Sequence, residues 1–158
     1  MLSRIEFDFY AMRIEYLLAV KRGEEFQDFF VRLGHALWEA DFEGRRPQGR
    51  LGDKKCDGFR VSTGTVFQCY GPREIKAREL EEKISADFEG AREHFGQALR
   101  GWVLVHNDAQ ELPTTSHELV MKLRERFPAL KIEIWGPTLL LQRAMGLDVN
   151  KLRLLVPG

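Results

Sequence analysis

The stretch that decides the fold is Asp57-Gly58-Phe59-Arg60-Val61-Ser62-Thr63-Gly64-Thr65-Val66-Phe67-Gln68-Cys69-Tyr70-Gly71-Pro72. Two β-prone runs surround a turn that contains glycine, which predicts a hairpin. With the turn centred near Thr63, Asp57 lies opposite Gln68 or Tyr70. Because opposed residues and residues two apart point to the same face, we expect these three side chains to project together. A slip of one residue in the register would separate them, and the turn fixes the register only weakly.

The rest of the chain has a pattern that predicts alternating helices and strands. The second helix is the clearest, because Phe26, Phe29, Phe30, Leu33 and Leu37 recur at helical spacing. The spacing of apolar residues predicts helices over residues 8–21, 24–37, 73–95, 115–126 and 137–146, and strands near 41–46, over 102–105 and over 131–135. We therefore expect one α/β domain over residues 1–158, a three-layer sandwich with a central mixed sheet flanked by helices.

The composition narrows the classes of function. The chain has 158 residues, 44% of them hydrophobic and 30% charged, which suits a globular domain with a proper core. Its net charge is zero, so a nucleic-acid contact has to come from a local patch, and Arg45, Arg46, Arg50, Lys54, Lys55 and Arg60 supply one. The alternative is a solvated basic loop. No apolar run approaches the roughly 20 residues of a membrane span.

The hairpin residues also resemble a known family. Gly23 to Gln27, Gly52 to Gly58 and Phe67 to Tyr70 resemble the restriction-endonuclease-like superfamily with the PD-(D/E)xK motif, in particular its Mrr-like branch. The resemblance implies a hydrolytic site with Mg²⁺ or Mn²⁺ and DNA as the partner. In that family the first acid binds the metal, the second position is Asp, Glu or Gln, and a Lys two residues later assists the attacking water. Asp57 matches the first position and Gln68 the second.

The third position departs from the family, because Tyr70 stands where Lys is expected. A phenol with a pKa near 10 is a poor replacement for that Lys. Lys76, Lys83 and Asp87 share one flank of the helix after Pro72, and we expect Lys83 or Lys76 to reach the site if that flank faces the hairpin. The alternative is an exposed Lys83–Asp87 pair worth a few tenths of a kcal/mol.

Glu25 is the other candidate metal ligand, since related enzymes place a helical acid near the ion. Alternatively, Glu24 and Glu25 are there because carboxylates are stabilised at the positive N-terminal end of the helix that starts near Gly23. Asp53 is better explained as a turn residue, and Asp57 beside Gly58 could itself be one. The candidate metal ligands are therefore Asp57, Gln68 and Glu25.

The remaining polar groups have simpler explanations. His106-Asn107-Asp108 follows a buried strand, where α/β folds often carry function, yet it also reads as a turn. The histidines lack zinc spacing with Cys56 or Cys69, and two cysteines without a signal peptide favour buried thiols in a reducing, cytoplasmic setting. The apolar ending Leu152 to Gly158 indicates a domain of a longer protein or a surface covered in a homodimer.

Two functions follow. The first is a metal-dependent DNA endonuclease domain with Asp57, Gln68, Tyr70, Lys83 and Glu25 in its site. Phe67 to Pro72, Trp102 to Asp108 and Ile134 to Gly136 also resemble a nuclease-like domain appended to larger bacterial proteins, several linked to anti-phage defence. The second function is a catalytically degenerate module on the same fold that binds nucleic acid or protein.

Overall fold

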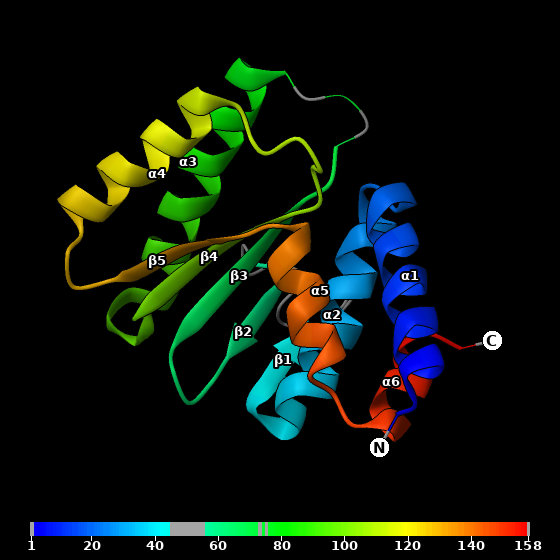
Figure 1. Ribbon diagram of the computed structural model, residues 1–158. Helices are drawn as coiled ribbons and strands as arrows, with labels where there is room; N and C mark the ends of the chain where they lie inside the picture. Colours follow the sequence, from blue (N-terminus) through cyan, green and yellow to red (C-terminus); the bar gives the residue numbers. More distant parts are fainter. Residues whose placement is uncertain (1, 45–55, 73, 75, 158) are drawn as a thin grey trace.

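The computed structural model describes residues 2–44, 56–72, 74 and 76–157. The described residues form one open sheet of five strands. Figure 1 shows helices on both faces of this sheet. The strands are β1 (Phe42–Gly44), β2 (Gly58–Arg60), β3 (Thr65–Tyr70), β4 (Gly101–His106) and β5 (Lys131–Trp135), and they lie in the order β1-β2-β3-β4-β5. The three-layer α/β sandwich expected from the sequence is confirmed.

The sheet is mixed because two kinds of connection build it. β1, β2 and β3 pair antiparallel, whereas β3, β4 and β5 pair parallel. The parallel strands are joined through α3 (Ala77–Phe95) and α4 (Thr114–Arg126), which cover the same face of the sheet. Successive crossovers of one hand place their helices on one side, so this face becomes a layer of two helices.

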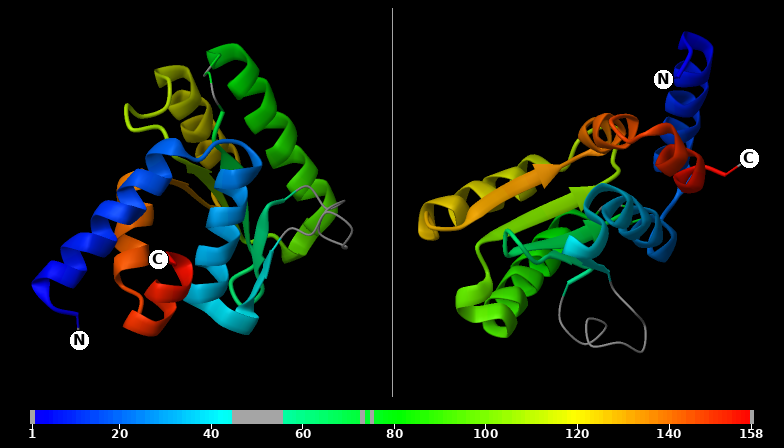
Figure 2. Two further views of the ribbon diagram at one scale, coloured as in Figure 1. Left: turned by 90° about the vertical axis from the view of Figure 1, so that its right-hand side faces the viewer. Right: turned by 90° about the horizontal axis from the view of Figure 1, so that it is seen from below.

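The opposite face carries the other helices, as Figure 2 shows. They are α1 (Arg4–Val20), α2 (Glu24–Trp38), α5 (Pro137–Met145) and α6 (Val149–Leu155). Helix α6 is not among the elements expected from the sequence. Leu152, Leu155 and Val156 are buried in the chain's own core, and Leu154 is the exposed apolar side chain of this ending. Most of this apolar ending is therefore covered by the chain's own core.

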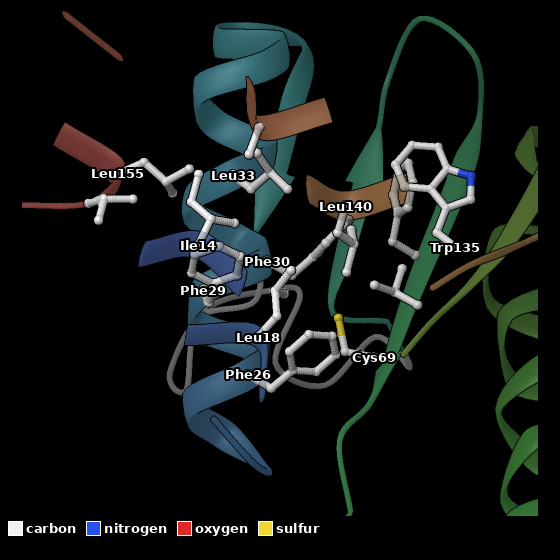
Figure 3. Close-up of a cluster of buried hydrophobic side chains, with 14 of the residues drawn as sticks. Ile14, Leu18, Phe26, Phe29, Phe30, Leu33, Cys69, Trp135, Leu140 and Leu155 are labelled. Atoms are coloured by element: carbon white, nitrogen blue, oxygen red, sulfur yellow. The ribbon is translucent and has the colours of Figure 1, made fainter. Parts of the chain in front are cut away.

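Each face of the sheet has its own hydrophobic core. The core under α1, α2, α5 and α6 is formed by the aromatic stripe of α2 with residues from β3, β4 and β5. Figure 3 shows Cys69 of β3 in this cluster together with Phe26, Leu140 and Trp135. The core under α3 and α4 contains Tyr70 and Trp102. Alternate residues of β3 thus face opposite layers, as the pleat of a strand requires.

The Phe42 ring of β1 packs so closely against α2 that a side chain has no room at the contact. Phe42 is buried next to Phe30, Trp38 and Phe67. A Cβ atom added to Gly34 of α2 would lie 2.6 Å from the Phe42 ring. Helix α2 can approach the sheet this closely because glycine stands at the contact.

The β2–β3 turn is held by Asp41, which lies just before β1. Its carboxylate accepts hydrogen bonds from Ser62 N at 2.7 Å and from Arg60 Nε at 3.0 Å. The bonds from Ser62, and then the nearby Arg60, lower the pKa of Asp41. Gly64 completes the turn with φ +62°, a conformation that glycine adopts without strain. Arg60, expected in a basic patch, is therefore paired with Asp41.

Candidate functional site

The hairpin places its three expected side chains at the carboxyl end of β3. Gly58 pairs with Phe67, so Asp57 comes next to Gln68 at the start of β2. Asp57 N donates to Phe67 O at 2.9 Å, and the Asp57 carboxylate accepts Cys69 N–H at 2.7 Å. Gln68 and Tyr70 point to the α3 side, whereas Phe67 and Cys69 point into the other core. Of the two partners expected for Asp57, this register favours Gln68 over Tyr70.

Asp57 has a structural contact that the sequence did not reveal. Its side chain is 8% exposed, and one carboxylate oxygen satisfies the backbone N–H of Cys69 across the hairpin. A charged acceptor on a buried N–H is among the stronger hydrogen bonds in a protein. Asp57 therefore closes the end of the β2–β3 ladder whether or not an ion binds there.

Gln68 is turned toward the core of the α3 layer. Its Oε1 accepts a hydrogen bond from Nε1 of Trp102, a fully buried residue of β4. An indole N–H is only a donor, so it needs an oxygen of this kind when it is buried. The oxygen that would serve as a metal ligand in the resemblance is thus used to satisfy Trp102.

Tyr70 makes a bond to α3. Its hydroxyl donates to Asp87 Oδ2 at 2.8 Å, and the Lys83 ammonium lies 5.5 Å from the centre of its ring. Burial, followed by the Asp87 charge and hydrogen bond and by the Asp57 charge, raises the pKa of Tyr70 well above its ordinary value. Tyr70 is therefore a hydrogen-bond donor here and cannot act as a base near neutral pH.

Lys83 lies where the helical spacing placed it. The flank of α3 that carries Lys83 and Asp87 faces the end of β3, and the Lys83 ammonium lies over the Tyr70 ring at cation–π distance. Lys76 is the N-cap residue just before α3. Sequence reasoning treated Asp87 as a partner for Lys83 on an exposed surface. Its hydrogen bond to the buried Tyr70 makes it a site residue instead, and its shared flank with Lys83 was the signal.

A small pocket opens beside this cluster. It has a volume of about 190 Å³ and lies between the start of α2, the end of β3 and the first turns of α3. Its lining includes Gln27, Tyr70, Lys76, Glu79 and Lys83. Gly23 N donates to Gly71 O at 2.8 Å, which holds the start of α2 against β3 and forms one wall.

Glu25 is placed away from this pocket. Its side chain is exposed, and the residue of α2 that lines the pocket is Gln27, two positions further along. Each residue of an α-helix is rotated by about 100° about the helix axis from the residue before it, so neighbours in sequence point in different directions. The structure thus brings together Asp57, Gln68, Tyr70 and Lys83, and it does not bring Glu25 to them.

The basic residues Arg45, Arg46, Arg50, Lys54 and Lys55, and the turn residue Asp53, lie outside the described residues. Within the described ranges, no three His, Cys, Asp or Glu side chains are grouped as metal ligands. None of the helices in these ranges combines the length and apolar composition that a membrane crossing needs. Cys56 and Cys69 are both free and buried, as expected.

A second hollow of about 410 Å³ lies at the carboxyl ends of β3 and β4. Here Asn107 donates to Leu18 O and Lys21 O at 2.9 and 2.6 Å, so it caps the end of α1. Asp108 N–H donates to His106 Nδ1 at 3.1 Å, and burial lowers the pKa of His106. Asp108 Oδ1 accepts Gln110 N–H at 2.9 Å, the local contact that the turn interpretation predicts, whereas the bonds of Asn107 reach α1 instead.

The expected ligand set of Asp57, Gln68 and Glu25 does not fit a divalent ion in this geometry. Glu25 lies outside the pocket and Gln68 Oε1 is bound by Trp102. The carboxylate bonded to Tyr70 comes from α3, because Asp87 Oδ2 accepts the Tyr70 hydroxyl, whereas Asp57 accepts Cys69 N–H. Magnesium sites in proteins often use one or two carboxylates together with water and phosphate oxygens. In this structure both carboxylates are bound by the chain's own groups, as Gln68 Oε1 is.

No protein-family model, curated protein or solved structure matched the chain when it was compared with them. The functional interpretation of this site therefore rests on the chain's own residues.

Proposed function

We propose that this chain is a nuclease-fold module that binds nucleic acid without hydrolysing it. The proposal rests on one observation: Gln68 and Tyr70, at the second and third positions of the motif, are both hydrogen-bonded within the chain. Gln68 Oε1 accepts the Trp102 indole N–H, and the Tyr70 hydroxyl donates to Asp87. Phosphodiester hydrolysis needs a group that orients or deprotonates water. The Tyr70 phenol in the Lys position is buried and remains protonated, so it does not supply that group.

Duplex DNA is the proposed ligand because two lysines line the pocket, beside Glu74 and Glu79, with Lys76 lying 3.9 Å from Glu79. Lys76 and Lys83 line it, and Lys83 is exposed above Tyr70. In the sequence, the basic run Arg45 to Lys55 leads directly into Asp57 at the start of β2. Lysine and arginine side chains that contact phosphates give binding that is independent of sequence and falls with salt. A local patch of this kind is compatible with a net charge of zero.

The proposal is tested by measuring the binding of the chain to a labelled DNA duplex. Fluorescence anisotropy gives the affinity at several salt concentrations, with EDTA or with Mg²⁺. The expected result is salt-dependent binding that is the same in both, with intact DNA afterwards. Lys83→Gln should weaken binding equally for unrelated sequences and lower the salt slope by about 1.

The matched control for that substitution is Lys122→Gln, because Lys122 is an exposed lysine of α4 that lines a different hollow. It should leave binding unchanged. Absence of binding at low salt, or equal effects of the two substitutions, would contradict the proposal.

The second candidate is the metal-dependent DNA endonuclease, with anti-phage defence as its proposed setting. One observation favours it: the Lys83 ammonium lies 5.5 Å from the Tyr70 ring, close to the position from which Lys is missing. Asp57 and Asp87 would hold the ion, and a bound magnesium would act as a Lewis acid on a phosphate oxygen. Lys83 would then orient water. Cleavage with Mg²⁺ that is lost in both Asp87→Asn and Lys83→Gln, with folding retained, would establish this function in place of the first.

A further inference from the structure

Helix α1 is apolar on two opposite faces. Its inner face packs on the core through Ile14 and Leu18, with Tyr10 and Leu17 partly buried beside them. Its outer face carries a second stripe, which consists of Ile5, Phe9, Met12, Tyr16 and Val20, exposed by 82, 44, 66, 63 and 51%. Figure 2 shows α1 on the outside of its layer. One face of α1 is thus explained by the fold, and the other is not.

The outer stripe is comparable to the largest apolar patches of ordinary monomers. Side chains of these sizes expose roughly 650 Å² at these fractions, whereas the largest patch on a typical monomer measures about 300–600 Å². Two copies of the stripe facing each other would bury at most about 1,300 Å², which is the low end of the range of specific interfaces. The area alone therefore suits pairing with an identical surface.

The spacing of the stripe fits a helix of the same kind. Ile5, Phe9, Met12 and Tyr16 follow steps of four, three and four residues, which is the seam that two helices share in a coiled coil. Such a seam is self-complementary, because identical side chains meet in layers when two copies are parallel and in register.

The charges beside the seam select the parallel orientation. Asp8 and Arg13 flank it on opposite sides, five residues apart, so parallel copies place Asp8 of one next to Arg13 of the other, twice over. An antiparallel pair would instead place Asp8 against Glu15, which repels, and Glu6 against Arg13, which attracts, so its charges would nearly cancel. The contacts of Asp8 with Arg4 and of Arg13 with Pro157 O both measure 3.4 Å, and the Asp8 side chain is 63% exposed.

We infer that a second copy of this chain covers the outer stripe, with the two α1 helices parallel. This inference is independent of the proposed nucleic-acid binding, because the stripe belongs to α1 and the pocket to α2, β3 and α3. It also moves the expected homodimer surface from the end of the chain to its first helix.

Sedimentation equilibrium of the intact chain tests the oligomeric state. The chain should form a dimer at micromolar concentrations, and Met12→Glu should raise the dissociation constant at least about 100-fold, because two carboxylates would enter the seam. The matched control is Met121→Glu on α4, since Met121 is 56% exposed and lies off the stripe. A monomeric chain, or equal dissociation constants for the two variants, would overturn the inference.

Cross-linking tests the orientation without relying on a charged substitution. In a parallel pair, Ile5→Cys meets its own counterpart, so mild oxidation should link the two copies. Tyr16→Cys should behave likewise. Links that form only when the Ile5→Cys and Tyr16→Cys chains are mixed would overturn the parallel arrangement. Circular dichroism of each variant confirms that exposed positions have been changed without loss of the fold.

Discussion

Replacement of Asp57 by alanine distinguishes a structural carboxylate from one that only binds metal. The carboxylate accepts the backbone N–H of Cys69 at 2.7 Å, and Asp57 and Cys69 are both buried. Alanine removes the acceptor and leaves the Cys69 N–H in a site that water reaches poorly. The effect should therefore appear in the complete absence of divalent ions.

The expected magnitude follows from that single bond. A hydrogen bond to a charged group contributes about 1.5–3 kcal/mol, and a buried donor without an acceptor costs about 1–3 kcal/mol. We expect Asp57→Ala to lower the free energy of unfolding by about 2 kcal/mol, which for a domain of this size lowers the melting temperature by about 4–8 °C. Asp57→Asn keeps an oxygen at the same place, so its loss should be smaller, about 1 kcal/mol.

The measurement is thermal and urea unfolding of the three proteins in EDTA, repeated with millimolar Mn²⁺. If Asp57 is structural, the order of stability is wild type, Asp57→Asn, Asp57→Ala in both conditions. A metal site would add a Mn²⁺-dependent rise in the wild-type midpoint, because the ion binds only the folded state. Equal midpoints of wild type and Asp57→Ala in EDTA would refute the structural reasoning.

Three further predictions concern the surrounding residues. Tyr70→Phe removes the bond to Asp87 and should cost about 1–2 kcal/mol in urea unfolding, and the native Tyr70 should not ionise in an absorbance titration at pH 10. Gly34→Ala should cost about 1–3 kcal/mol, because the new methyl group meets the buried Phe42 ring, and an unchanged midpoint would show that the ring can move. Burial lowers the pKa of His106 below its ordinary 6.5, so the unfolded chain takes up a proton that the folded one resists. Stability should thus fall as the pH drops below 6.5, and His106→Gln should reduce that fall between pH 7.5 and 5.5.

The sequence was sufficient for the order and type of most elements. The strand predicted over residues 131–135 is β5, and the helix predicted from Pro137 is α5, with Gly146 at its C-cap. These segments carry their own signals, namely alternation, helical spacing, proline and glycine. Helix α6 was missed because its seven residues give too short a pattern to separate a helix from an apolar tail.

For the candidate site, the sequence predicted the directions of side chains within one strand or helix, but not the contacts between different elements. The shared direction of Gln68 and Tyr70 follows from the pleat of β3, and Lys83 was placed by the spacing of one helix. The bonds from Trp102 to Gln68 and from Tyr70 to Asp87 join separate elements. Their existence depends on how far apart those elements pack, which no local pattern encodes.

The sequence alone was enough for the alternation of helices and strands and for the side of β3 from which Gln68 and Tyr70 project, whereas the hairpin register is known from the structure. Only the tertiary structure decided that Gln68 turns to Trp102, that Asp87 belongs to the site, that Glu25 lies outside it, and that α1 leaves an apolar stripe uncovered. The physical reason is the separation along the chain of the residues that interact. Periodicity and turns arise from neighbouring residues, whereas hydrogen-bond partners and exposed faces are set by contacts between segments far apart in the chain.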